Sequence, residues 1–300
     1  MRMREPVPYV GRFAPSPTGP LHFGSLVAAV ASYLQARVNH GRWLLRIEDI
    51  DPPREQAGAT EQIIEALGRY GFEWDGDTLF QSSSREAHQE ALQYLLEHHF
   101  AYRCRCSRRD LANVARGPLG TIYPGTCRAG CGPGEAAIRI RTTDSQITFE
   151  DELQGPIVSS LESESGDFVV RRRDGLIAYQ LAVVVDDEIQ DITEVVRGID
   201  LLDSTPRQIW LQQLLGYQTP NYMHIPVITH SDGDKLSKLT GAAAIPLDAI
   251  EKTLVAALVA LQQEPPPNLA QETVEKIWNW AENNWSPEKL SGRKAIVKLP

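Results

Sequence analysis

Long hydrophobic runs are absent from this sequence. No stretch reaches about 18 consecutive apolar residues, the length that a membrane-spanning helix needs. The basic and proline-rich start, residues 1–8, is not followed by the apolar segment of a secretory signal peptide. These two absences predict a cytoplasmic protein that does not contact a membrane.

An excess of positive charge is also absent. The chain has 30 lysines and arginines against 39 aspartates and glutamates, a formal net charge of -9 and a pI of about 5.3. A protein this acidic does not bind nucleic acid through its overall charge. A local basic face remains compatible with the sequence, because arginines gather in two places. They are Arg103, Arg105, Arg108, Arg109, Arg116 and Arg128, and then Arg171, Arg172 and Arg173.

Cysteine is scarce and unevenly placed. The sequence has 4 cysteines, and all of them lie between Cys104 and Cys131. A disulfide-rich secreted protein normally spreads its cysteines along the chain. The clustering therefore predicts one metal site, and four thiolates would suit a tetrahedral Zn²⁺.

The first 50 residues predict a parallel βαβ unit. Residues 9–13 form a short apolar strand, residues 14–24 a loop rich in proline and glycine, and residues 25–38 an apolar helix with Ser25 as its N-cap. Residues 43–47 predict the second strand. The loop then lies at the carboxyl end of the first strand, where open α/β sheets bind ligands.

Further elements are expected along the whole chain. Helices are predicted at 60–70, 84–99 (with a capping box of Ser83 and Glu86), 205–215, 247–262 and 272–285, and strands at 137–141, 168–171, 177–185, 192–196 and 225–229. The strands at 137–141 and 168–171 follow the cysteine-rich segment and predict an antiparallel insert. The pattern favours an α/β fold that this insert interrupts.

The most informative segment is residues 12–25, Arg-Phe-Ala-Pro-Ser-Pro-Thr-Gly-Pro-Leu-His-Phe-Gly-Ser. It leaves a strand, turns on prolines and glycines and starts a helix, so its backbone N–H groups suit a phosphate. His22 is placed to donate to a phosphate oxygen, and Gly24 lets an adenine or ribose approach the backbone. A lone loop histidine is usually a surface residue. The whole segment, however, resembles the first signature of class I glutamyl-tRNA synthetases, although Ser25 departs from the histidine or glycine found there.

Two more segments carry the same resemblance. Residues 235–239, Lys-Leu-Ser-Lys-Leu, are similar to the Lys-Met-Ser-Lys-Ser loop, with leucine as the last residue, and residues 196–208 are similar to the Arg-Gly-x-Asp…Thr-Pro-Arg-Gln stretch. The resemblance implies that His22, Gly24, Lys235 and Lys238 bind ATP, which Mg²⁺ accompanies. It also implies that His22 and Lys238 are catalytic, because they stabilise charge that moves onto the leaving pyrophosphate.

Glutamate presents one ammonium and two carboxylates. Glu48, at the end of the second predicted strand, suits the ammonium, and Arg12 and Arg197, also at strand ends, suit carboxylates. The sequence leaves open which arginine meets which carboxylate, and Glu48 alone would be an ordinary surface acid. The resemblance implies an L-glutamate pocket made of Arg12, Ala14, Ser16, Glu48, Tyr179 and Arg197.

The resemblance also refines the metal site. In the short members of this family, the glutamyl-queuosine tRNA(Asp) synthetases, Cys-x-Cys is followed by Tyr-x3-Cys, and Tyr123 and Cys127 fit that spacing. The implied ligands of a structural Zn²⁺ are Cys104, Cys106, Tyr123 and Cys127. Cys131 remains the alternative to Tyr123.

The implied architecture is an α/β, Rossmann-like class I synthetase catalytic domain with an inserted zinc-bearing α+β subdomain and a small helical C-terminal part. We place the catalytic halves at 1–100 and 177–240, the insert at 101–176 and the helical part at 241–300. The lysine segment belongs to the second half.

Little chain follows Leu239, whereas longer members of the family continue into an anticodon-binding region. The resemblance thus implies a monomeric ligase that converts L-glutamate and ATP to glutamyl-adenylate and transfers glutamate to queuosine in the anticodon stem-loop of tRNA(Asp). Two alternatives stay open: a synthetase that charges the tRNA 3′ end, and a non-catalytic tRNA-binding paralogue. The presence of His22, Lys238, Glu48 and Arg197 argues against the latter.

Overall fold

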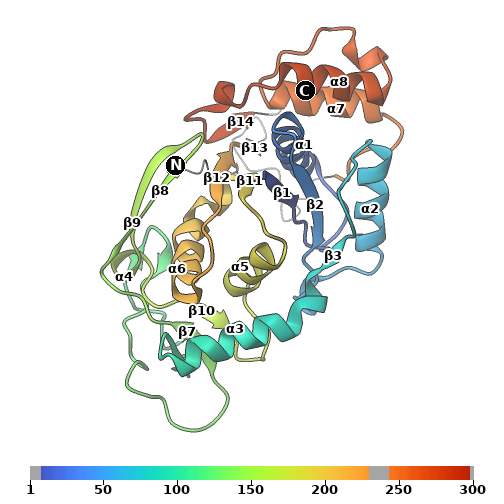
Figure 1. The fold of residues 1–300 in the computed structure, drawn as a ribbon. Coiled ribbons are helices and arrows are strands. Elements are labelled where there is room, and N and C mark those ends of the chain that lie inside the picture. Colours follow the sequence, from blue (N-terminus) through green and yellow to red (C-terminus); the bar gives the residue numbers. More distant parts are fainter. Residues whose placement is uncertain (1–7, 230–242, 298–300) are drawn as a thin grey trace, which may run out of the picture.

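A parallel sheet opens the fold in the computed structural model, which describes residues 8–229 and 243–297 (Figure 1). Its strands are β1 (Val10–Phe13), β2 (Arg42–Ile47) and β3 (Leu79–Phe80), in the order β1-β2-β3. The helix α1 (Phe23–Val38) links β1 to β2, which confirms the predicted βαβ unit. The segment with Lys235 and Lys238 lies outside the described residues.

The start of α1 differs from the prediction. His22, and not Ser25, is the N-cap, and its side chain Nδ1 accepts the backbone N–H of Ser25 at 3.3 Å. The imidazole supplies the acceptor lone pair that a serine oxygen would otherwise supply at this position. The helix therefore begins two residues earlier, and its first turn belongs to the signature segment.

A second sheet continues the first. Its strands are β11 (Glu194–Gly198), β12 (Asn221–Ile225), β8 (Gln146–Asp151) and β9 (Gly155–Ser160), in the order β11-β12-β8-β9. The N–H of Thr193, just before β11, donates to the carbonyl of Val10 at 3.0 Å, so β11 starts beside the start of β1. The hairpin β8–β9 and the strand β12 were not predicted.

Helices cover the joined sheets. They are α2 (Ala59–Arg69), α3 (Arg85–Glu97), α5 (Tyr179–Ile189) and α6 (Thr205–Leu215). The predictions for α2, α3 and α6 are confirmed within a few residues, but α3 has no capping box, because the Ser83 hydroxyl donates to the carbonyl of Phe80.

The strand predicted at 177–185 is wrong, because this segment forms α5. Its valines favour a strand locally, yet an apolar run that is buried on all sides is equally compatible with a buried helix. Val183, Val184 and Val185 are all at most 2% exposed, in the core that α5 shares with α3 and α6. Tertiary burial therefore decides the conformation here.

The insert is a separate antiparallel sheet, as predicted. Its strands β4 (Ala101–Cys104), β7 (Ala137–Ile140) and β10 (Val169–Arg171) pair in the order β10-β7-β4. A small hairpin, β5 (Arg116–Gly117) with β6 (Gly120–Thr121), and a short helix, α4 (Leu161–Glu164), complete this region. It occupies the lower left of Figure 1, away from the C-terminal helices.

The C-terminal helices α7 (Ile250–Ala260) and α8 (Val274–Asn284) pack against α1, and β14 (Ala295–Val297) pairs with β13 (Val227–Thr229). Trp278 of α8 joins an aromatic cluster with Tyr33 and Phe72, at ring-centroid distances of 4.7 and 5.0 Å. This tail therefore shares one core with the first βαβ unit. Among the described residues, no helix combines the length and apolar character needed to cross a membrane.

Candidate amino-acid and nucleotide site

The predicted pocket residues lie at the carboxyl ends of adjacent strands. Arg12 is on β1, Arg197 is on β11, and Glu48 directly follows β2. Ala14 and Ser16 are in the loop after β1, where the Glu48 N–H donates to the carbonyl of Pro15 at 3.0 Å. This hydrogen bond connects the end of β2 to the loop that follows β1, which is part of the segment 12–25. This edge is where parallel α/β sheets bind ligands.

Arg12 is held by a buried carboxylate that the sequence did not reveal. Its Nε donates to Asp187 Oδ1 at 3.1 Å, and Arg46 donates to the same oxygen at 2.8 Å. Arg12 is 4% exposed and Arg46 is fully buried. Within the described part of the chain, this ion pair is the only one that Arg12 forms, so its terminal nitrogens keep their donors for another acceptor.

Glu48 lies at the edge of this network. Its side chain is 8% exposed, and its nearest cation is Arg46, at 3.7 Å between Oε1 and Nη2. Burial, which outweighs the attraction of Arg46 and Arg12, raises the pKa of Glu48 to about 7. Among the described residues, Arg46 is the one cation within 4 Å of this carboxylate, and an added ammonium would stabilise its charged form.

Arg197 is fixed on three sides. Its Nε donates to His224 Nε2 at 3.0 Å, and its terminal nitrogens donate to Thr205 Oγ1 at 2.8 Å and to Tyr179 at 3.4 Å. Arg197 as a whole is 6% exposed. His224 is a further residue that the sequence did not reveal, because nothing in its local sequence indicates a polar contact.

Tyr179, the first residue of α5, connects the two sides of the pocket. Burial raises the pKa of Tyr179. The charges of Arg197 and Arg12 lower this pKa, and the charge of Glu48 raises it. Of these three charged groups, Arg197 contacts the phenol directly, at 3.4 Å from the Tyr179 hydroxyl. Arg12, Arg197 and Glu48 thus lie at the carboxyl ends of neighbouring strands, and their binding of glutamate stays a prediction.

The first turn of α1 forms the adjoining part of the site. His22 caps it, its Nε2 lies 3.0 Å from the Ser25 hydroxyl, and Gly24 is the second residue of the helix. The N-terminus of this helix offers backbone donors and a positive dipole to an anion. The two predicted lysines of the ATP site cannot be placed, since their segment is not described.

The cysteine cluster lies within the insert. The sulfur atoms of Cys104, Cys106 and Cys127 lie within 4.8 Å of one another. The Tyr123 hydroxyl is 3.3 Å from Cys104 Sγ and 3.4 Å from Cys106 Sγ, and the sulfurs of Cys106 and Cys127 are 3.6 Å apart. Tetrahedral Zn²⁺ would separate two sulfurs by about 3.8 Å and a sulfur from an oxygen by about 3.5 Å. These four groups therefore fit one zinc ion.

Cationic and polar groups around the cluster suit negatively charged ligands. The guanidinium of Arg139 lies 4.0 Å from the ring centroid of Tyr123, and its Nε donates to Cys104 Sγ at 3.3 Å. Burial acts against ionisation of Cys127, but hydrogen bonds, first that of Tyr123, lower the pKa of this thiol to about 7. Cys131 packs at the edge of the cluster, and its thiol donates to the Gly132 carbonyl at 3.8 Å.

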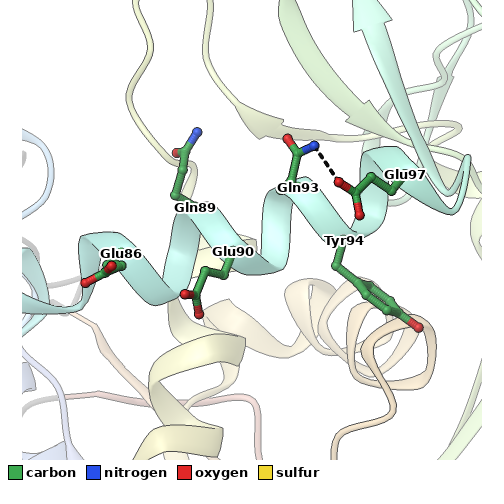
Figure 2. A pocket seen from close by; sticks show the side chains of 6 residues that line it. All are labelled: Glu86, Gln89, Glu90, Gln93, Tyr94 and Glu97. Carbon is green, nitrogen blue, oxygen red and sulfur yellow. Dashed lines mark hydrogen bonds between the residues drawn. The ribbon is translucent and has the colours of Figure 1, made fainter.

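A separate hollow follows the outward face of α3 and has different chemistry. Figure 2 shows six side chains of this helix along it, and none of them is a predicted site residue. They are Glu86, Gln89, Glu90, Gln93, Tyr94 and Glu97. Three carboxylates repel the phosphates of ATP or RNA. The buried face of the same helix packs against α5, where His88 lies 2.8 Å from Asp186.

The sequence matches a known protein family over most of its length. Residues 9–119 and 127–253 match the family described as tRNA synthetases class I (E and Q), catalytic domain. The chain belongs to this family. Membership makes it a ligase-type enzyme of the aminoacyl-tRNA synthetase kind, and the candidate site residues on β1, β11 and after β2 lie inside the matched residues.

Individual relatives agree with this family. The chain is 52% identical to the glutamyl-Q tRNA(Asp) synthetase of Pseudomonas syringae pv. syringae (strain B728a), over 94% of both chains. It is 50% identical to the enzyme of the same name from Dechloromonas aromatica (strain RCB), over 98% of this chain and 99% of the other.

Solved structures show the same fold at low identity. A glutamate-tRNA synthetase from Elizabethkingia anophelis has a TM-score of 0.80 and 22% identity, covering 97% of this chain and 68% of that one. A glutamate tRNA ligase from Elizabethkingia meningosepticum, solved with its amino acid, also has a TM-score of 0.80, at 23% identity. The class I synthetase catalytic fold is thereby shown.

Proposed function

We propose that this enzyme activates L-glutamate with ATP and transfers the glutamyl group to queuosine in the anticodon loop of tRNA(Asp). One observation carries the first half of the proposal: the buried arginines Arg12 and Arg197 and the 8% exposed side chain of Glu48 come from the carboxyl ends of neighbouring strands. Glutamate has the complementary set, with two carboxylates and one ammonium. Amino acids with fewer charges would leave a buried charge unpaired, which is costly.

The strand order suggests how the substrate lies. Glu48 follows β2, the signature loop and α1 follow β1, and Arg197 is on β11, on the far side of β1. The ammonium pairs with Glu48, and the α-carboxylate faces the first turn of α1, where phosphates bind. The side-chain carboxylate then extends toward Arg197. We assign Arg12, Ala14, Ser16 and Tyr179 to the walls of this pocket.

The reaction has two steps, and neither needs a covalent enzyme intermediate. A glutamate carboxylate oxygen attacks the α-phosphorus of ATP, which binds as its Mg²⁺ complex, and pyrophosphate leaves. A hydroxyl of the acceptor then attacks the carbonyl carbon of glutamyl-adenylate, and AMP leaves. His22, Lys235 and Lys238 bind the nucleotide with Gly24, and His22 and Lys238 stabilise the charge of the transition state.

The acceptor is assigned from the relatives. Glutamyl-Q tRNA(Asp) synthetases share about half of their residues with this chain over nearly all of both lengths. Identity of this extent supports the same acceptor. The glutamate-tRNA synthetase structures, at 22% and 23% identity, support the fold only.

We further propose that Cys104, Cys106, Tyr123 and Cys127 hold one Zn²⁺. The distances among their donor atoms and the cation above Tyr123 support this ligand set, and Cys131 has no such position. Four protein ligands leave no position open for substrate, so the ion supplies structure and not catalysis.

Replacement of Lys238, the second lysine of the segment 235–239, tests the activation of glutamate by ATP. We expect Lys238→Ala to lower glutamate-dependent ATP–pyrophosphate exchange by about 100- to 1,000-fold, because it removes a cation that acts on the transition state. Glutamate affinity should change by less than about threefold, since the pocket is intact. Lys276→Ala, on an exposed face of α8, is the matched control. Full exchange activity in Lys238→Ala would refute the assigned role.

A further inference from the structure

A buried chain of three side chains lies behind the pocket. Asp151 Oδ2 is 2.5 Å from His224 Nδ1, and His224 Nε2 is 3.0 Å from Arg197 Nε. Asp151 ends β8, His224 is on β12 and Arg197 is on β11, and the last two are direct partners in the sheet register. Their exposed fractions are 1%, 0% and 6%. Three adjacent strands thus each contribute one member.

The proton positions follow from the donor inventory. The backbone N–H groups of Leu153, Gln154 and His224 all donate to Asp151, which therefore acts as an acceptor. Only a proton on His224 Nδ1 can complete the short contact to this carboxylate. The neutral ring then has its lone pair on Nε2, which accepts the N–H of Arg197 at 3.0 Å and also lies 3.2 Å from the Thr205 hydroxyl.

Protonation of His224 would break this arrangement. An imidazolium has N–H groups on both ring nitrogens, so Nε2 would meet the Arg197 Nε–H donor to donor. Burial, first, and the charge of Arg197 lower the pKa of His224, although Asp151 acts in the opposite direction. The neutral tautomer with hydrogen on Nδ1 is the one that satisfies all three residues.

The remaining donors of Arg197 can be counted. A guanidinium has five N–H groups. One is used by His224, one by Thr205 and one by Tyr179. Among the described residues, no acceptor contacts the other two N–H groups, one on each terminal nitrogen, and two is the number that a carboxylate accepts in a paired contact. A carboxamide has only one acceptor oxygen, so in the same paired contact its NH₂ group would face one of the two N–H donors.

We propose that His224, held in one tautomer by Asp151, is a positioning residue that orients Arg197 so that its two remaining N–H groups select the side-chain carboxylate of the substrate over a carboxamide. This inference rests on the proposed function, because it takes glutamate as the substrate that Arg197 meets. It adds two residues, Asp151 and His224, that do not touch the substrate. Their expected effect is on affinity and selectivity, with the chemical step itself left intact.

Two substitutions test the inference in the full-length enzyme. His224→Leu removes the acceptor for Arg197, and Asp151→Asn allows the other tautomer by offering an NH₂ group to Nδ1. Both should raise the KM for glutamate in ATP–pyrophosphate exchange, run with and without tRNA(Asp), by about 10- to 100-fold. The kcat should change by less than about threefold. The preference for glutamate over glutamine should fall by at least about tenfold.

A second buried His–Asp pair provides the matched control. His88 lies 2.8 Å from Asp186, is fully buried and does not contact Arg197. His88→Gln should lower the melting temperature as the test variants do, while the KM and the preference for glutamate stay unchanged. An equal change of KM in His88→Gln would show that general loss of packing is the cause and would overturn the inference.

One measurement does not depend on how the variants fold. The ¹⁵N chemical shifts of the His224 ring in the unsubstituted protein should show hydrogen on Nδ1 and a bare Nε2 between pH 6 and 8. Hydrogen on Nε2 would overturn the inference. If the unsubstituted enzyme shows no glutamate-dependent exchange at all, the proposed function fails; if it does and the variants keep their KM and selectivity, only the inference fails.

Discussion

The positions of the charged side chains in this site depend on the residues to which they are hydrogen-bonded. Glu48 and Arg197 could be predicted because strand ends of an α/β sheet are visible in the sequence. Asp187, which holds Arg12, and His224, which holds Arg197, were not predicted, since hydrogen-bond partners far apart in the sequence leave no local pattern. The assignment of the six pocket residues to glutamate binding stays a prediction.

The pKa of Glu48 gives a pH prediction. Burial raises this pKa to about 7, so below pH 7 the carboxyl is mostly protonated and loses its attraction for an ammonium. We expect the Kd for glutamate, measured calorimetrically without ATP, to rise as the pH falls from 8 to 6, and binding near pH 7 to release a proton. Deprotonation strengthens binding, so affinity is highest on the alkaline side.

Glu48→Gln is the control for this titration. The neutral amide should weaken glutamate binding by about 10- to 100-fold at pH 8 and remove the component of the pH profile that has its midpoint near 7. An identical profile in the unsubstituted protein and in Glu48→Gln would mean that another group titrates, and the role given to Glu48 would be wrong.

Helices and strands were predicted well where the apolar residues recur with one clear period. They were predicted poorly where a segment is buried on all sides, because its apolar residues then show no period. The βαβ unit, α2, α3 and α6 follow clear periodicities or stop signals. The valine-rich α5 was predicted as a strand. The strand β8 was missed although its residues alternate between exposed and less exposed, and β9 was missed because it exposes the apolar Val158 and buries the polar Ser159. The insert was recognised by its composition, and its four candidate ligands lie together.

Loss of a single ligand tests the insert. Cys104→Ser should lower the zinc content, measured by mass spectrometry, from about one ion per chain to near zero, because serine is a poor zinc ligand at neutral pH. Hydrogen exchange should then accelerate in β4, β7 and β10, while β1 and β2 keep their protection. Cys131→Ser should retain the ion. Loss of zinc in Cys131→Ser would identify Cys131 in place of Tyr123 as the fourth ligand, and zinc that is kept in Cys104→Ser would show that Cys104 is not a ligand.

At the scale of the whole molecule, the sequence predicted the α/β class and the interrupted catalytic fold, and the family match confirms the class I synthetase assignment. It did not reveal that the C-terminal helices share a core with the first βαβ unit through Trp278, because a tail without motifs has no pattern that indicates its packing partner. The division at residues 100, 176 and 240 stays a prediction.

The most direct test of the central claim is transfer of labelled glutamate to tRNA(Asp) that carries or lacks queuosine, each with an intact or a trimmed 3′ end. The account predicts incorporation into queuosine-containing tRNA(Asp) with either 3′ end and none into tRNA(Asp) without queuosine. Incorporation that requires the intact 3′ end and ignores queuosine would contradict it and would instead identify an enzyme that charges the end of the tRNA.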